Sequence, residues 1–212
     1  MLDAQTHGLT MTDRKYAWHP LKKEIGELRV GLAGSPGTGK KSVGKELSKL
    51  TGLDFVSLNE IAIKRKIGRR SNGEFVVDIQ KLRKLRIDTR GRIISGHLLP
   101  YVIPTDRLDF VAILRCSPRV LRRRYLARGY SMRKTEENVE AELLDIVSFK
   151  CLESYGRRKV AEFDTTRIRN PETVAKRIMD TLKRKIPRRY GVASWSLMAS
   201  RSPKSLRKLL QY

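Results

Sequence analysis

The stretch Leu28–Lys40, which reads LRVGLAGSPGTGK, decides the fold of this chain. It opens with a short apolar run, which predicts a buried strand. The glycines Gly34, Gly37 and Gly39 follow, and glycine adopts the left-handed backbone angles that let a turn pass close to a bound group. Beyond the turn, apolar residues recur at helical spacing, which predicts a helix over 39–50.

A glycine-rich turn between a strand and a helix is the context of a phosphate-binding loop. Successive main-chain N–H groups of such a turn point inward, and the helix N-terminus adds positive potential. The motif lysine adds an ammonium group that can reach the β- and γ-phosphates of a nucleotide. A turn with no ligand is the alternative. We predict that the following residues bind the phosphates of ATP: Gly34, Gly37, Thr38, Gly39 and Lys40.

The position after the motif lysine departs from the usual pattern. Ser or Thr there supplies a hydroxyl to Mg²⁺, whereas this chain has Lys41 and carries Ser42 one place later. An ammonium group cannot coordinate Mg²⁺, but Lys41 could supply a substitute charge near the phosphates. We therefore expect Lys41 and Ser42 at phosphate positions, nucleotide affinity to persist, and metal-assisted turnover to be weakened.

The charge balance predicts a polyanionic partner. Lys and Arg total 46, Asp and Glu total 22, and the net charge is +24. Neutralised phosphates release counterions, so a basic surface favours nucleic acid. The ion-pair networks of thermophilic proteins would explain many charges but not a twofold basic excess.

Composition also excludes several classes of protein. The chain lacks the run of apolar residues that a membrane span needs, and its N-terminus lacks the apolar core of a signal peptide. We therefore expect a cytoplasmic protein. Cys116 and Cys151 are isolated, so neither a zinc knuckle nor a disulfide framework is predicted, and we predict no metal-ligating residues.

Predicted strands and helices alternate along the chain, which is typical of a parallel α/β sheet with helices on both faces. The polar, basic segment 67–77 is predicted to be a loop. Asn59 and Asn170 are predicted to cap helices. Besides the two elements above, we predict strands at 53–58, 92–94, 108–115 and 160–164, and helices at 59–65, 78–87, 117–127, 135–155 and 171–185.

Three parts are expected. Residues 1–26 have weak periodicity and are interpreted as a flexible leader, 27–185 hold the alternating elements, and 186–212 form a basic tail. From Lys183 to the end the chain has nine Lys or Arg and no acidic residue. The tail is either a solvated end or an extension that contacts RNA or the ribosome, with Trp195 among the groups that can stack on bases.

Together with the phosphate loop, further segments carry a family resemblance: Leu58-Asn-Glu60, Ile94-Ser-Gly-His97, and Arg128-Gly-Tyr130 followed by Glu137-Asn-Val-Glu-Ala-Glu142. Over roughly residues 28–165 the chain resembles the small archaeal and eukaryotic adenylate kinases that assist ribosome assembly, known in eukaryotes as the sixth adenylate kinase isoenzyme.

This resemblance implies a P-loop NTPase-type fold with a parallel five-stranded sheet, a short segment for the nucleoside monophosphate at about 57–80 and a short lid at about 127–137. It implies phosphoryl transfer from ATP to AMP, ATP hydrolysis, and a role in rRNA processing and small-subunit assembly. The implied partners are ATP, AMP, a platform protein of the small ribosomal subunit, and pre-rRNA or the ribosome. Mg²⁺ is the expected metal of the reaction.

The family's third-strand motif is Asp-x-His, and here it is Ser95-Gly96-His97. The acid that orients the Mg²⁺ shell or water is therefore absent. Ser95 and Lys41 both stand where the usual residue would serve the binding of Mg²⁺. Together they indicate altered metal use or weakened catalysis.

Catalytic roles follow from the need to neutralise and align phosphates. Lys40 would neutralise the ATP tail. Arg128, with Arg124 or Arg133, would close over the transferring group. His97 would position water or the acceptor oxygen, the alternative being a structural histidine.

Three residues are candidates for the AMP side of the site. Arg115 ends a strand where ligands of open α/β sheets bind, the alternative being a solvated arginine. Asn59 and Glu60 are either AMP contacts or helix-capping residues. A separate acidic cluster either complements a helix dipole or receives a basic ribosomal-protein tail: Glu136, Glu137, Glu140, Glu142 and Asp145.

Three functions therefore compete. The first is an active adenylate kinase and ATPase. The second is an assembly factor with weakened catalysis, which binds rRNA or a small-subunit ribosomal protein and uses the nucleotide as a conformational ligand. The third is a kinase for a metabolite hydroxyl, against which the basic charge argues.

Overall fold

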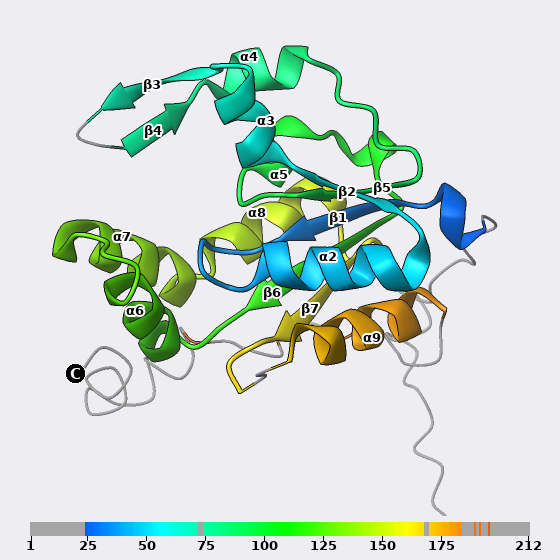
Figure 1. Cartoon of the computed structure of the whole chain (residues 1–212). Coiled ribbons are helices and arrows are strands. Elements are labelled where there is room, and N and C mark those ends of the chain that lie inside the picture. The colour runs from blue at the N-terminus through cyan, green and yellow to red at the C-terminus, as the bar shows by residue number, and fades with distance from the viewer. Residues whose placement is uncertain are drawn as a thin grey trace, which may run out of the picture.

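A parallel five-stranded sheet forms the centre of the molecule, as predicted (Figure 1). The structure is a computed structural model that describes residues 24–71, 74–167 and 170–183, together with Arg189, Gly191 and Trp195. The strand order is β2-β5-β1-β6-β7, and every neighbouring pair is parallel. The strands are β1 (Arg29–Ala33), β2 (Asp54–Ser57), β5 (Arg92–Ser95), β6 (Phe110–Arg115) and β7 (Val160–Asp164).

One face of the sheet is covered by α2 (Lys40–Thr51) and α9 (Pro171–Leu182), which lie side by side (Figure 1). Their apolar residues share one buried cluster with the strands. The predicted cap of α9 is confirmed, because the Asn170 carboxamide oxygen accepts from the Glu172 N–H at 2.9 Å. Leu47 of α2 and Ile178 of α9 are fully buried in this cluster.

The other face is covered by α8 (Ile146–Tyr155) and by α5 (Leu99–Val102), a short helix that the sequence did not indicate. The Tyr155 hydroxyl joins the two, lying 2.9 Å from the carbonyl oxygens of both Leu99 and Ile103. At Gly31 the sheet has no side chain, and Leu99 fills the space: a Cβ there would lie 2.7 Å from Leu99 Cδ2.

The loop prediction for 67–77 is wrong, because this segment forms an antiparallel hairpin of β3 (Gly68–Ser71) and β4 (Glu74–Val77). Phe75 and Val77 pack against the core while Val76 between them is exposed. The run Phe-Val-Val is typical of a half-buried strand. The basic residues earlier in the segment make it look polar overall, so this apolar run did not indicate a strand.

The single helix predicted over 135–155 is two helices, α7 (Met132–Leu143) and α8. The break lies at Asp145, whose φ of 57° is left-handed. The Asp145 carboxylate is ion-paired with Arg115, thirty residues earlier in sequence. A distant partner holds the break, so local helical spacing could not reveal it.

Smaller corrections concern the helix ends. Ser57, not Asn59, caps α3 (Leu58–Lys64), because its hydroxyl accepts from the Glu60 N–H. The helix predicted over 78–87 is the shorter α4 (Ile79–Lys84), capped by Asp78. The helix α6 (Pro118–Leu126) begins directly after Ser117, and Pro118 occupies its first turn. Two short 3-10 helices are η1 (Ile25–Glu27) and η2 (Thr105–Arg107).

Replacing Gly31 by alanine tests the close approach of α5 to the sheet. The added methyl group collides with Leu99, so Gly31→Ala should lower the free energy of unfolding by about 1–3 kcal/mol in urea denaturation. Gly26→Ala is the matched control, because nothing lies within 4 Å of its Cβ, and it should change stability by less than about 0.5 kcal/mol.

A double-mutant cycle gives the sharper result. Leu99→Ala should cost less in the Gly31→Ala background than in the natural protein, since the methyl group then occupies part of the vacated space. If Leu99→Ala lowers the free energy of unfolding equally in both backgrounds, the packing of Leu99 does not depend on the residue at position 31.

Candidate functional site

The phosphate loop lies at the carboxyl ends of the parallel strands, between β1 and α2. Gly34, Gly37 and Gly39 have φ values of 139°, 77° and 95°, so the predicted need for glycine is confirmed at each. Gly34 is the most constrained, because a Cβ would lie 2.4 Å from the Leu114 carbonyl oxygen. The side chain of buried Thr38 closes the turn by donating to the Ser35 carbonyl oxygen at 2.8 Å.

Lys40 extends across the inside of the loop. Its ammonium group donates to the carbonyl oxygens of Gly34 at 2.7 Å and Ser35 at 2.8 Å. Burial lowers the pKa of Lys40 to about 8, the Glu142 carboxylate opposes this decrease, and the nearby charge of Arg128 adds to it. A phosphate anion beside Lys40 would favour the charged form. The site is therefore built to gain from a bound polyphosphate.

Helix α6 holds the outer side of the loop. The Arg124 guanidinium donates to the Gly37 carbonyl oxygen at 2.9 Å, and the Tyr125 hydroxyl donates to the Pro36 carbonyl oxygen at 2.5 Å. Tyr130 stacks on Tyr125 with ring centroids 5.3 Å apart. Arg124, one candidate for closing over the phosphoryl group, is therefore engaged with the loop backbone.

Arg128 lies exposed in the turn between α6 and α7, close enough to Lys40 to affect its pKa. This is the position expected of a group that approaches the phosphates. Arg133, the other candidate, is exposed and ion-paired with Glu137. Of the three arginines, Arg128 combines exposure with proximity to Lys40.

Lys41 and Glu60 form an ion pair that the sequence analysis did not anticipate. The Lys41 ammonium lies 2.8 Å from Glu60 Oε1, and both side chains are more than half exposed. The pair connects the first turn of α2 to α3. Ser42 is exposed on the same turn.

A cavity of about 340 Å³ has His97 in its lining, and His97 is close enough to Lys40 of the phosphate loop for that charge to affect its pKa. The cavity brings together Asn59 and His97, two of the predicted site residues, with Lys134, which was not predicted. The pKa of His97 is lowered to about 4, first by burial and then by the charges of Lys40 and Lys134, so its imidazole is neutral at pH 7. The other lining residues are apolar: Ile63, Phe75, Val76, Val77, Ile79 and Leu98.

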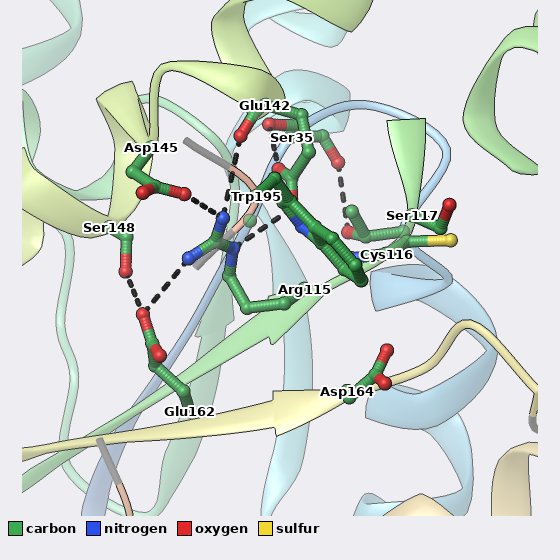
Figure 2. Close-up of polar contacts among 12 residues, drawn as sticks. Ser35, Arg115, Cys116, Ser117, Glu142, Asp145, Ser148, Glu162, Asp164 and Trp195 are labelled. Atoms are coloured by element: carbon green, nitrogen blue, oxygen red, sulfur yellow. Dashed lines mark hydrogen bonds and ion pairs between the residues drawn. The ribbon is translucent and has the colours of Figure 1, made fainter. Parts of the chain in front are cut away.

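The prediction for Arg115 is wrong. Its side chain is buried and ion-paired with Glu142 at 2.9 Å, Glu162 at 3.1 Å, and Asp145 (Figure 2). These carboxylates raise its pKa against the effect of burial. Because its guanidinium is enclosed by three acids, it is not available to an acceptor phosphate. The position of Arg115 at the end of a strand indicated a binding site, but no neighbouring residue in the sequence indicated that its side chain is buried.

Two members of the predicted acidic cluster belong to this buried network instead. Glu142 is 2% exposed and accepts hydrogen bonds from the Ser35 hydroxyl at 2.6 Å and the Cys116 N–H at 3.1 Å. Asp145 contacts Arg115. Glu142 and Asp145 are therefore not part of a surface that receives a basic tail. The other three acidic residues, Glu136, Glu137 and Glu140, are exposed.

Trp195 also belongs to this network. It is 7% exposed, and its indole N–H donates to Glu142 Oε1 at 3.3 Å (Figure 2). The Arg189 carbonyl oxygen accepts from the Glu162 N–H at 2.9 Å. The expectation that Trp195 is free to stack on bases is therefore wrong for this structure. The leader, apart from 24–26, and most of the tail lie outside the described residues.

Protein ligands for Mg²⁺ do not fit at the two positions where the motifs would place them. Lys41 offers an ammonium group, and Ser95 is 4% exposed within the sheet. Among the described residues there is no group of three or more His, Cys, Asp or Glu side chains that could hold a metal ion. In that same part of the chain, the helices are too short or too polar to cross a membrane.

The strand–loop–helix geometry and the parallel sheet define a P-loop kinase fold. A family model described as an AAA domain matches residues 30–145. A protein of Thermococcus onnurineus (strain NA1) named "Putative adenylate kinase" is 41% identical over 170 residues, which cover 79% of this chain and 91% of that one. A protein of the same name from Thermococcus gammatolerans is 35% identical over 170 residues, which cover 79% of this chain and 92% of that one. The chain belongs to this family of archaeal P-loop proteins.

Solved structures agree on the fold. Shikimate kinase from Acinetobacter baumannii, solved with shikimate, superposes with a TM-score of 0.51 and 18% identity, covering 76% of this chain and 96% of that one. Shikimate kinase from Bacteroides thetaiotaomicron superposes with a TM-score of 0.50, also at 18% identity, covering 74% and 98%. At this identity the likeness concerns the fold alone.

The pKa of Lys40 predicts a pH-dependent affinity for ADP. Above pH 8 the free protein loses the Lys40 proton, while bound phosphates raise its pKa, so binding must take up a proton. The dissociation constant, measured by calorimetry from pH 7 to 9.5, should rise above pH 8 with a limiting slope of about tenfold per pH unit.

Lys40→Arg is the control for this effect, because arginine keeps its charge throughout the range. Its ADP affinity should be weaker but nearly constant with pH. A flat profile in the natural protein would contradict the assignment of Lys40 to the phosphates.

Proposed function

We propose that this protein is an adenylate kinase, or a closely related nucleoside monophosphate kinase, that transfers the γ-phosphoryl group of ATP to AMP and also hydrolyses ATP. The observation that carries this proposal is the cavity that is lined by apolar side chains and by Asn59, His97 and Lys134, because the charge of Lys40 acts on the His97 of its lining. The archaeal relatives named as adenylate kinases support it.

The cavity suits a nucleoside monophosphate. Its apolar wall comes from α3, the β4 strand and α4, and includes Ile63, Phe75 and Ile79. A purine ring would gain from burial against this wall. Lys134 and His97 supply the polar side, and the Lys134 ammonium can neutralise the acceptor phosphate. The predicted segment 57–80 thus contributes most of the wall.

The chemistry asks for alignment and charge neutralisation. An oxygen of the AMP phosphate attacks the γ-phosphorus, the bond from that phosphorus to the β–γ bridging oxygen breaks, and ADP leaves. The attacking oxygen is already ionised, so no general base is needed. Lys40 and Arg128 would neutralise the developing charge, and the neutral imidazole of His97 would orient the acceptor or a water molecule.

A second function is favoured by the two departures at the metal-binding positions. Lys41 and Ser95 point to a protein with weakened turnover that binds nucleotide as a conformational ligand. In this form it would act in small-subunit assembly and rRNA processing, with rRNA or a platform protein of the small ribosomal subunit as partner. The net charge of +24 supports a nucleic-acid partner.

A coupled assay of ADP formation from ATP and AMP tests the kinase. Lys40→Ala should reduce kcat by about a hundredfold or more, because it removes charge stabilisation at the reacting phosphates. Phe75→Ala should raise the KM for AMP about tenfold with little change in the KM for ATP.

Phe149→Ala is the matched control, since this phenylalanine is 67% exposed on α8 and does not line the cavity. It should leave both KM values unchanged. If the purified protein transfers phosphate to none of the nucleoside monophosphates, the kinase proposal fails and the assembly factor stands.

Restoring a hydroxyl after the motif lysine tests the account of weakened turnover. Lys41→Thr should increase ATP turnover with Mg²⁺, and Lys41→Thr combined with Ser95→Asp should increase it further. Loss of the exposed pair with Glu60 should cost less than about 1 kcal/mol of stability. Measurements with Mg²⁺ and with EDTA separate metal-dependent turnover from nucleotide binding.

Lys45→Thr, one helical turn along α2, is the control and should have no such effect. Unchanged turnover in both variants at position 41 would contradict the interpretation of Lys41 as the cause.

A further inference from the structure

We propose that a C-terminal segment, of which the structure describes Arg189, Gly191 and Trp195, is a positive regulatory element of the nucleotide site. Trp195, seated on Glu142, fixes the carboxylate that positions Ser35 of the phosphate loop, so that nucleotide binding and seating of Trp195 strengthen each other. Glu142 and Trp195 act as positioning residues. The inference deepens the proposed function, but it rests on nucleotide binding alone and not on phosphoryl transfer.

A continuous chain of contacts leads from the segment to the phosphate loop. The Trp195 indole N–H donates to Glu142 Oε1 at 3.3 Å. The other oxygen, Oε2, accepts from the Ser35 hydroxyl at 2.6 Å. The Ser35 carbonyl oxygen in turn accepts from the Lys40 ammonium at 2.8 Å. Three contacts, through Glu142 and Ser35, thus join Trp195 to the group that would hold the phosphates.

Glu142 is the shared element of this chain. Its Oε1 atom accepts from three donors: the Trp195 indole, Arg115 Nε at 2.9 Å and the Cys116 N–H at 3.1 Å. Its side chain is almost completely buried. A buried carboxylate depends on its donors, and a fully satisfied buried network is more rigid than a partly satisfied one. Removal of the indole would take away one of these donors.

A second described residue of the segment, Arg189, contacts the same network. The Arg189 carbonyl oxygen accepts from the Glu162 N–H at 2.9 Å, and Glu162 is the strand β7 residue whose carboxylate pairs with Arg115 at 3.1 Å. Two residues of the segment therefore contact the same buried network, one through a backbone carbonyl and one through an indole. The contact of Trp195 is not an isolated one.

Thermodynamic linkage makes the proposal reciprocal. If seating of Trp195 preorganises Ser35 and thereby increases nucleotide affinity by some factor, nucleotide binding must increase the seating equilibrium by the same factor. Couplings of this kind are typically at least fivefold. The two directions can be measured with different signals, which gives the proposal two independent tests.

The first test measures affinity. Trp195→Phe keeps an aromatic ring but removes the N–H donor, and Trp195→Ala removes both. Calorimetry with ADP should give a dissociation constant about two- to fivefold higher for Trp195→Phe and about five- to tenfold higher for Trp195→Ala. Trp18→Phe, the same substitution at the other tryptophan of the chain, is the matched control and should leave the affinity unchanged.

The second test keeps Trp195 intact and therefore does not depend on a folded Trp195 variant. In Trp18→Phe the remaining tryptophan is Trp195. Saturating ADP should reduce quenching of its fluorescence by acrylamide, because the seated state becomes more populated. Quenching that is unaffected by ADP, together with unchanged ADP affinity in the Trp195 variants, would overturn the proposal.

A double-mutant cycle tests the route. Ser35→Ala removes the hydroxyl that links Glu142 to the loop, so Trp195→Phe should have no further effect on ADP affinity in that background. Equal effects with and without Ser35 would overturn the role of Ser35. Absence of phosphoryl transfer with ADP binding and coupling intact would instead reject the kinase proposal alone.

Discussion

The buried charge of Arg115, at the carboxyl end of β6, is the constraint on which this edge of the sheet depends. A guanidinium that is nearly inaccessible to water must be paired, because an uncompensated buried charge is strongly destabilising. Three carboxylates meet this need, from α7, from the α7–α8 junction and from β7. The same requirement breaks the helix at Asp145, turns Glu142 inward and places α7 behind the phosphate loop.

Three carboxylates around one guanidinium leave an excess of negative charge, and further hydrogen-bond donors satisfy these carboxylates, one of them from the phosphate loop. Ser35 and the Cys116 N–H bind Glu142, and Ser148 binds Glu162. On the other side of Ser35 stands Lys40, whose pKa Glu142 raises against the effect of burial. The Glu142 carboxylate thus lies on one side of Ser35 and the Lys40 ammonium on the other, an arrangement in which Glu142 favours the charged form of Lys40.

Local signals were sufficient where a structure depends on neighbours in sequence. The strand, the turn with its three glycines and the following helix were all predicted, and so were the parallel sheet and the Asn170 cap. Contacts between residues that are distant in sequence could not be predicted. In the sequence, Arg115 cannot be distinguished from a solvated arginine at the end of a strand. In the same way, Trp195 cannot be distinguished from an exposed aromatic residue in a basic tail. Only the fold shows that acids distant in sequence bury the first and bind the second. The hairpin was missed because arginines mask an apolar run.

The two departures from the motifs lie on a different side of the loop from this network. Lys41 pairs with Glu60, the neighbour of Asn59, and Ser95 precedes His97 by two residues. Asn59 and His97 both line the cavity. Lys41 and Ser95 therefore lie near the residues that line the cavity, whereas Glu142 and Trp195 contact the network that includes Ser35 of the phosphate loop. Under our proposals, Lys40 serves both nucleotide affinity and turnover, whereas Lys41 and Ser95 concern turnover and Trp195 concerns affinity, so a variant of one of the last three can change one property without the other.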